Sequence, residues 1–215
     1  MSTYVLIPGA GSDSWFWHRV TPLLEARGHD VVAVDLPSAD PAAGLAEYTQ
    51  AALEQIGDRS DLVVVAQSLG GFTGPLICAE RPVELLILLN AMIPRPGETS
   101  WWSATGYPLT FDDFDPVEVF LHDVPEEVAA EAMRRAGDQA DTPMDEPWPL
   151  DAWPDVPTQF VLARDDRLFP AEWMRGVVRD RLGIEAVEID GGHCVALSRP
   201  EALVETFESL RLAQV

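Results

Sequence analysis

The most informative stretch of the sequence is Leu62-Val63-Val64-Val65-Ala66-Gln67-Ser68-Leu69-Gly70-Gly71-Phe72, in which an apolar run leads to a serine flanked by small residues. An apolar run without polar alternation is typical of a strand buried on both faces of a parallel sheet. A helical pattern follows, so Ser68 is predicted to lie on a sharp turn between a strand and a helix. A nucleophile on such a turn needs small residues two positions to either side, and the usual pattern is Gly-x-Ser-x-Gly. Ala66 replaces the first glycine here, and an ordinary serine at a strand–helix turn is the alternative interpretation.

Apolar runs of similar length recur along the chain and alternate with longer helical patterns. The pattern predicts strands at Tyr4–Ile7, Val31–Leu36, Leu62–Gln67, Leu85–Asn90, Gln159–Ala163 and Val187–Ile189. It predicts helices at Trp17–Arg27, Leu45–Ile56, Gly70–Arg81, Ala171–Arg181 and Glu201–Arg211. Strands and helices in alternation indicate a doubly wound α/β domain with helices on both faces of the sheet. A length of 215 residues suits one such domain.

One region interrupts this alternation. Residues 91–153 show no strand pattern and are rich in Pro, Asp and Trp. Within them, Asp123–Gly137 is predicted to be a helix, because acidic residues stand near its start and arginines near its end. A long insertion is usually functional, so we expect a cap over the carboxyl ends of the strands, where ligands bind on such sheets. The expected core then comprises residues 1–90 and 154–215.

A serine nucleophile needs a general base and an acid that orients the base. On a sheet of this kind the three residues follow one another along the chain in the order Ser, acid, His. Of the four histidines, His193 alone follows Ser68 outside the predicted cap, just after the last predicted strand. Asp165 and Asp166 both follow a strand, and Asp166 is preferred because Pro170, four residues later, leads into the next helix. We therefore expect Ser68, His193 and Asp166 to form a catalytic triad.

The oxyanion that forms during acyl transfer needs backbone N–H donors. One donor is predicted to be the N–H of Leu69, the residue after the nucleophile. The other is expected at Ala10, in the loop after the first strand, where neighbouring glycines let the backbone approach a ligand closely.

Aromatic side chains in the cap and beside the oxyanion loop are candidates for an apolar substrate pocket. They are Trp15, Phe16, Trp101, Trp102, Tyr107, Phe111, Phe114 and Trp148. The alternative is that the cap aromatics only seal the cap onto the core.

Other polar residues are interpreted as structural. Asp112-Asp113-x-Asp115 has no companion cluster with calcium-loop spacing, so it predicts a solvated acidic loop rather than a metal site. Cys194 is expected to be a buried, unreactive thiol, since His193 already has a serine partner. His18 and His122 are expected to be structural or exposed. No metal, nucleotide or flavin cofactor is expected.

The charge balance limits the partners. Asp and Glu number 36 against 14 basic residues, for a formal net charge of -22. A field of this sign repels nucleic acid and anionic membrane surfaces, so neither is expected as a partner. Every basic residue is Arg, which excludes Schiff-base chemistry by a lysine of this chain. With no signal-peptide pattern, no membrane-length apolar run and only two cysteines, we expect a cytoplasmic protein. A monomer or homodimer is expected, since the acidity keeps copies of the chain apart.

Several motifs in a fixed order resemble the α/β-hydrolase superfamily. They are Val5-Leu6-Ile7-Pro8-Gly9-Ala10-Gly11, Trp15-Phe16-Trp17, Leu36-Pro37, Gln67-Ser68-Leu69-Gly70-Gly71, Gly192-His193 and Ser198-x-Pro200. Within it, the chain looks like the branch that holds plant methyl esterases, hydroxynitrile lyases and many bacterial hydrolases. The resemblance covers nearly the whole chain apart from the cap. It implies a trimmed α/β-hydrolase fold of about six parallel strands, because the chain has no room before Tyr4 for the first two strands of the full fold.

Two departures from the family pattern affect the expected chemistry. Pro8 stands where the family usually has a histidine that supports the oxyanion loop, so the shape of this loop is open. The hydroxynitrile lyases of this branch use an active-site lysine to stabilise the cyanide leaving group, and this chain has no lysine. The resemblance therefore favours hydrolysis over cyanohydrin cleavage.

Together these features predict a carboxylesterase-like enzyme that cleaves an ester, lactone or thioester of a small apolar molecule through an acyl-enzyme. Two alternatives stay open. One is a C–C hydrolase, dehydratase or cyclase of a biosynthetic pathway on the same scaffold. The other is a ligand-binding protein with vestigial hydrolase activity.

Overall fold

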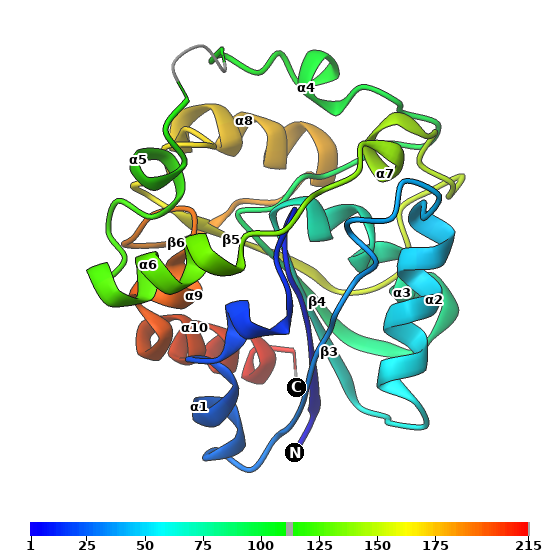
Figure 1. Ribbon diagram of the computed structural model, residues 1–215. Coiled ribbons are helices and arrows are strands. Elements are labelled where there is room, and N and C mark those ends of the chain that lie inside the picture. Colours follow the sequence, from blue (N-terminus) through cyan, green and yellow to red (C-terminus); the bar gives the residue numbers. More distant parts are fainter. Residues whose placement is uncertain (111–113, 215) are drawn as a thin grey trace.

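The computed structural model describes residues 1–110 and 114–214, and its centre is one parallel sheet (Figure 1). The strand order is β2-β1-β3-β4-β5-β6, and every neighbouring pair is parallel. The strands are β1 (Thr3–Ile7), β2 (Asp30–Ala33), β3 (Leu62–Gln67), β4 (Val83–Leu89), β5 (Thr158–Ala163) and β6 (Val187–Ile189). The predicted six-stranded α/β-hydrolase architecture is confirmed.

The continuous apolar runs form strands because both faces of the sheet are buried. All residues of β1 and β3 are buried, and their register pairs Val5 with Val64. Alternate residues of β3 then enter two separate cores: Val64 packs in one and Val65 in the other. Burial on both faces accounts for the absence of polar alternation in the sequence.

Helices cover both faces of the sheet. On the face that receives Val65, the covering elements are η1 (Ser14–Trp17), α1 (Thr21–Glu25), α9 (Val195–Ser198) and α10 (Pro200–Leu212). On the face that receives Val64, they are α2 (Leu45–Ile56), η2 (Ser68–Phe72), α3 (Gly74–Glu80) and α8 (Ala171–Leu182). Figure 1 shows these two groups on opposite sides of the strands.

Three predicted core elements differ from the structure by a break or by more than two residues. The single helix predicted at Gly70–Arg81 is divided into η2, which ends at Phe72, and α3, which begins at Gly74. The single helix predicted at Trp17–Arg27 is wrong: η1 ends at Trp17 and α1 begins at Thr21. Pro22 lies in the first turn of α1, where its missing N–H is not needed, so the proline starts a new helix there. The strand predicted at Val31–Leu36 ends at Ala33 as β2, which lies at the edge of the sheet.

The predicted cap corresponds to the segment between β4 and β5. It carries α4 (Trp101–Ala104), α5 (Pro116–Phe120), α6 (Glu126–Arg135) and α7 (Thr142–Asp145). Helix α6 is the one predicted at Asp123–Gly137, whereas the three short helices were not predicted. In Figure 1 this segment lies over the end of the sheet at which the strands finish.

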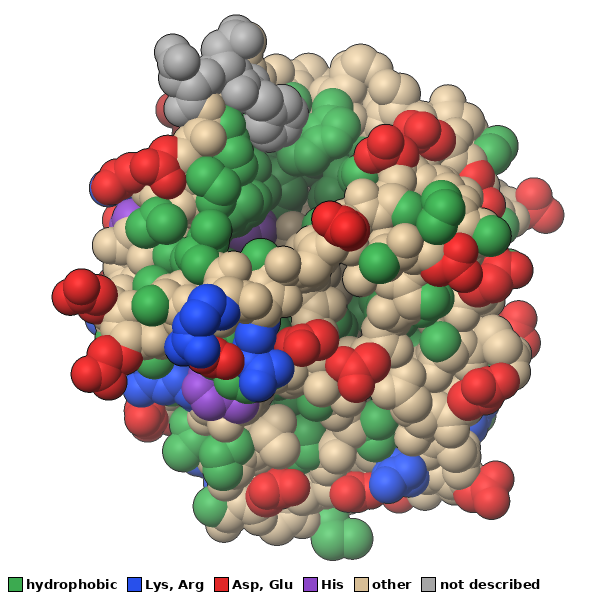
Figure 2. All heavy atoms as spheres, viewed as in Figure 1, with side chains coloured by type: hydrophobic (Ala, Val, Ile, Leu, Met, Phe, Trp, Pro, Cys, Tyr) green, Lys and Arg blue, Asp and Glu red, His purple; other side chains and the backbone are tan. Residues whose placement is uncertain are grey.

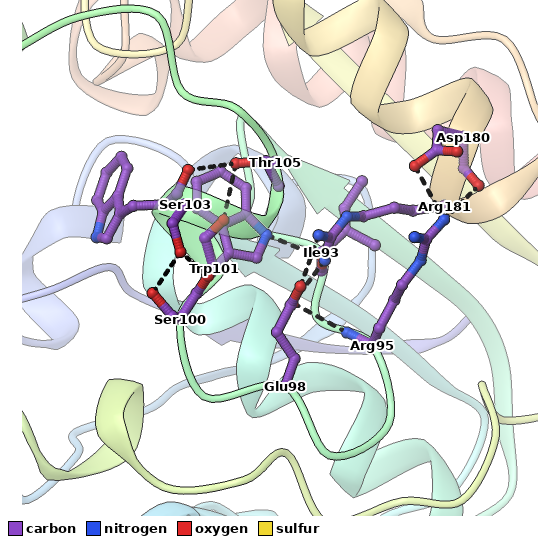
Figure 3. Close-up of polar contacts among 10 residues, drawn as sticks. Ile93, Arg95, Glu98, Ser100, Trp101, Ser103, Thr105, Asp180 and Arg181 are labelled. Carbon is purple, nitrogen blue, oxygen red and sulfur yellow. Dashed lines mark hydrogen bonds and ion pairs between the residues drawn. The ribbon is translucent and has the colours of Figure 1, made fainter.

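The start of this segment is tied to α8 by a buried ion pair (Figure 3). Arg181 donates to both carboxylate oxygens of Glu98, at 2.6 and 2.7 Å, and its side chain is 2% exposed. Arg181 and the indole of Trp101 both donate to the carbonyl oxygen of Ile93. The beginning of the cap is therefore held by hydrogen bonds as well as by packing.

Candidate active site

Ser68 lies where β3 meets η2, in a backbone conformation that L-residues rarely adopt. Its φ is 51°, in the left-handed region, and its carbonyl oxygen accepts a hydrogen bond from the N–H of Met92 at 2.9 Å. A strained serine between a strand and a helix is the geometry expected of a nucleophile. The methyl group of Ala66 is accommodated because Gly74 faces it: a Cβ on Gly74 would lie 2.8 Å from that of Ala66.

His193 and Asp166 form a buried pair next to this turn. Nδ1–H of His193 donates to Oδ2 of Asp166 at 2.8 Å, and the Asp166 side chain is fully buried. The other oxygen, Oδ1, accepts the N–H groups of Leu168 and Phe169 at 2.8 and 2.9 Å. This pattern leaves Nε2 of His193 as the acceptor nitrogen. Asp165 is exposed and bonds the N–H of Gly191, so the geometry favours Asp166 as the acid.

Two polar residues beside His193 were not singled out in the sequence. The side-chain amide of Gln67 donates to Nε2 of His193 at 3.1 Å. Asn90, fully buried at the end of β4, donates to the carbonyl oxygen of His193 at 3.3 Å and accepts the N–H of Ala163 at 2.8 Å. The sequence signal for both is a polar residue that ends an apolar strand.

The backbone groups predicted for the oxyanion hole lie beside Ser68. Ala10 and Leu69 both line the cavity that contains Ser68 and His193. Leu69 is the second residue of η2, and the first N–H groups of a helix have no acceptor within the helix. Its N–H is therefore available to an oxyanion.

The cavity over Ser68 has a volume of about 390 Å³ and is mostly apolar. Figure 2 shows it as a hollow bordered by hydrophobic side chains, on a face that is otherwise scattered with acidic residues. Four predicted pocket residues line it: Trp15, Phe16, Trp102 and Phe114. Further apolar side chains that the sequence analysis did not single out also line it: Met92, Phe120, Leu121, Met144, Leu168 and Phe169.

Three other predicted pocket residues, Trp101, Tyr107 and Trp148, are not among the described residues that line the cavity. Trp101 and Trp148 are buried in the core. Their indole N–H groups donate to the carbonyl oxygens of Ile93 and Phe72, so they seal the cap onto the core, which was the alternative interpretation. Phe111 lies outside the described residues.

Aromatic rings and a thiol surround the imidazole of His193. The rings of Phe120 and Phe169 lie 5.4 and 5.2 Å from it, centroid to centroid. Cys194 also lines the cavity, and burial, together with the nearby carboxylates of Asp166 and Asp123, raises the pKa of its thiol. A raised pKa keeps this sulfur protonated and weakly nucleophilic at neutral pH.

The remaining residues considered from the sequence have local partners. His18 stacks on Trp15 with centroids 4.2 Å apart, and Asp115 caps α5. His122 donates from Nε2 to the carbonyl oxygen of Asp165 at 3.0 Å. Within residues 1–110 and 114–214, no helix is long and apolar enough to cross a membrane.

A strained serine at the end of a central parallel strand, beside a buried histidine–carboxylate pair, defines an α/β-hydrolase-type enzyme. Comparison with known proteins agrees: residues 4–206 match the alpha/beta hydrolase family, and the chain belongs to this family.

Individual relatives share the whole length of the chain at modest identity. An alpha-hydroxynitrile lyase from Arabidopsis thaliana is 25% identical, with 96% of each chain covered. A pyrethroid hydrolase from Sphingobium wenxiniae is 26% identical, covering 94% of this chain and 85% of the relative. Among solved structures, polyneuridine aldehyde esterase superposes with a TM-score of 0.85 at 18% identity, over 98% of this chain and 99% of the other. The family match and the hydrolase relative support an enzyme of hydrolase type, and the solved structure supports the fold.

Proposed function

We propose that the protein is a serine hydrolase that cleaves an ester, lactone or thioester of a small apolar molecule. The observation that carries the proposal is that His193, which Asp166 holds at 2.8 Å, lines the same apolar cavity as the strained Ser68. A histidine held by a carboxylate is the general base that a serine hydroxyl needs.

In the proposed reaction, Oγ of Ser68 attacks the acyl carbonyl carbon while Nε2 of His193 takes the hydroxyl proton. The N–H groups of Ala10 and Leu69 hold the oxyanion. The carbon–oxygen or carbon–sulfur bond to the leaving group then breaks, and His193 gives its proton to that group. Water, deprotonated by His193, then attacks the acyl-enzyme. As the bond between the acyl carbon and Oγ breaks, His193 returns the proton to Oγ, which releases the acid and free Ser68. Asp166 keeps the histidine tautomer fixed and stabilises the imidazolium.

The lining of the cavity supports an apolar substrate. Aromatic and aliphatic side chains form most of it, and Arg135 is the one basic residue among those described along its wall. That arginine is already paired with Glu131 and Asp13. The net charge of -22 also disfavours an anionic substrate.

Steady-state hydrolysis of p-nitrophenyl esters of increasing acyl length tests the proposal, with Ser68→Ala as the inactive control. Sustained turnover that is lost in Ser68→Ala supports it. A burst near one equivalent followed by little turnover would support the ligand-binding alternative. No turnover by folded protein would overturn the esterase proposal and favour C–C bond or elimination chemistry. Cyanide release from mandelonitrile is measured in parallel, and release of cyanide without ester turnover would show cyanohydrin cleavage in place of hydrolysis.

A further inference from the structure

The residues just before α6 contact both loops that carry the histidine–carboxylate pair. Oδ2 of Asp123 accepts the N–H of Gly192 at 2.9 Å, and His122 donates to the carbonyl oxygen of Asp165 at 3.0 Å. Gly192 immediately precedes His193, and Asp165 immediately precedes Asp166. The contact is close, since a Cβ on Gly192 would lie 2.7 Å from Oδ1 of Asp123 and 2.7 Å from Nε2 of His122.

The residues just after α6 hydrogen-bond to the oxyanion loop, which follows β1 and contains Ala10. The N–H of Gly137 donates to the carbonyl oxygen of Gly11 at 2.9 Å, and Oε1 of Gln139 accepts the N–H of Gly11 at 3.1 Å. Gly11 immediately follows Ala10. The side-chain amide of Gln139 is itself fixed, because it donates to the hydroxyl oxygen of Tyr48 at 3.0 Å. These bonds supply support for the loop in which Pro8 replaces the histidine of the family pattern.

Helix α6 has the length needed to join these two places. The histidine and acid loops follow β6 and β5, and the oxyanion loop follows β1, with β3 and β4 between β1 and β5 in the sheet. Three strand spacings amount to about 14 Å, and a helix of ten residues is about 15 Å long. In Figure 1, α6 passes across the ends of the strands. Its residues Ala132, Met133 and Arg135 form part of the cavity wall.

We propose that α6 and the residues on either side of it hold the loops of His193 and Asp166 in a fixed position relative to the oxyanion loop. Asp123, before the helix, and Gln139, after it, are the positioning residues. Asp123 acts through Gly192 on the imidazole of His193, and Gln139 acts through Gly11 on the N–H of Ala10. Oδ1 of Asp123 is buried and has no hydrogen-bond partner in the described part of the chain, which costs desolvation free energy. A buried polar atom of this kind calls for an explanation, and a positioning role of the carboxylate supplies one. The catalytic part of this inference rests on the proposed function.

The expected effect is on the chemical step. Asp123→Ala and Gln139→Ala each lower kcat for a p-nitrophenyl ester by about 10- to 100-fold with little change in KM, because misplacement by about 1 Å has effects of this size. Asp123→Asn and Gln139→Glu retain the oxygen that accepts the loop N–H, so they restore most of the activity. Glu127→Gln and Asp138→Ala are matched controls, since both side chains are exposed beside the same two ends of α6.

Hydrogen exchange of the full-length variants gives a readout that needs no activity. We expect Asp123→Ala to accelerate amide exchange in residues 190–194 and Gln139→Ala to accelerate it in residues 9–12, while circular dichroism shows both folded. If Asp123→Ala and Gln139→Ala show the same exchange rates in these loops as the wild-type protein, the positioning role is overturned. It is also overturned if the enzyme is active and the kcat values of these two variants equal those of the two controls. If the wild-type protein hydrolyses no ester, the proposed function fails, and the exchange rates alone decide whether α6 holds the loops.

Discussion

The side-chain amide of Gln67 lies 3.1 Å from Nε2 of His193, the nitrogen that takes the proton of Ser68 in the proposed reaction. The other end of this amide lies against the oxyanion loop, because a Cβ on Gly9 would come within 2.4 Å of Oε1 of Gln67. Gln67 therefore contacts both the general base and the loop that holds the oxyanion. As an amide N–H donor, it can bond Nε2 only when this nitrogen carries no proton.

A negative charge at this position should shift the pH dependence of the enzyme. In Gln67→Glu, a carboxylate beside Nε2 stabilises the imidazolium, so His193 keeps its proton to higher pH. The acid limb of the profile of kcat/KM against pH is expected to move up by about 1 pH unit. Gln67→Met, similar in length and uncharged, is the control and should move the limb less. If the acid limb of the kcat/KM profile of Gln67→Glu overlays that of the wild-type enzyme, the side chain at position 67 does not contact His193 during turnover.

The contact between Ala66 and Gly74 predicts a compensating pair of substitutions. Gly74→Ala alone places a methyl group 2.8 Å from the Cβ of Ala66, and overpacking of this kind is expected to lower the free energy of unfolding by about 1–3 kcal/mol. Adding Ala66→Gly removes the clash, so the double variant should be more stable than Gly74→Ala alone. Urea unfolding of the four proteins measures the coupling. If the effects of the two single substitutions on the free energy of unfolding simply add, the side chains at positions 66 and 74 are not in contact.

Much of the fold could be predicted because its central strands are buried on both faces. The strands at Leu62–Gln67 and Val187–Ile189 have the predicted bounds, as does the helix at Leu45–Ile56. The order of Ser68, Asp166 and His193 along the chain also indicated their approach in space, since each follows a strand of one parallel sheet. Local pattern and topology both act on such residues, so the sequence alone predicts that they lie at the same edge of the sheet.

Residues whose role depends on tertiary contacts could not be found in this way. Asn90 holds the loop of His193, and nothing in its local sequence shows where its amide points. Trp101 and Trp102 are neighbours of the same type, yet one seals the core and the other lines the cavity. The contacts of Asp123 and Gln139 join segments 69 and 128 residues apart. Such contacts follow from how the cap lies on the core, which no local pattern encodes.

The buried ion pair of Figure 3 predicts a large effect of single substitutions on stability. Glu98→Ala leaves the guanidinium of Arg181 buried without its carboxylate, and such a loss is expected to cost about 3 kcal/mol of unfolding free energy. The double variant Glu98→Leu, Arg181→Met should recover at least half of this, because no buried charge remains. Arg95→Ala is the matched control: its pair with Asp180 is exposed, so about 1 kcal/mol or less is expected. Equal losses in Glu98→Ala and Arg95→Ala, measured by urea unfolding, would show that burial of the Glu98–Arg181 pair does not increase the cost of breaking it.

Glu208 on α10 predicts a pH-dependent contribution to stability. Burial acts to raise its pKa, but hydrogen bonds from Arg211 and Tyr4 and the nearby His29 outweigh burial and lower the pKa from 4.5 to about 2. A lowered pKa in the folded state means that the ionised carboxylate stabilises the fold at pH values above 4.5. This contribution is lost as the pH falls from 4.5 towards 2, where the folded protein also takes up the proton.

Glu208→Gln should therefore lower the free energy of unfolding at pH 7 by about 1–2 kcal/mol, a value reduced for the solvent that reaches this side chain. The difference in unfolding free energy between Glu208→Gln and the wild-type protein should shrink in urea titrations at pH 4.5, 4 and 3.5. The reason is that the ionised carboxylate of the wild-type protein stabilises the fold less and less as the pH falls. Glu205→Gln, an exposed substitution on the same helix, should change stability little at any of these pH values. A difference between Glu208→Gln and wild type that stays constant from pH 7 to 3.5 would show that the charge of Glu208 is not what stabilises α10 against β1.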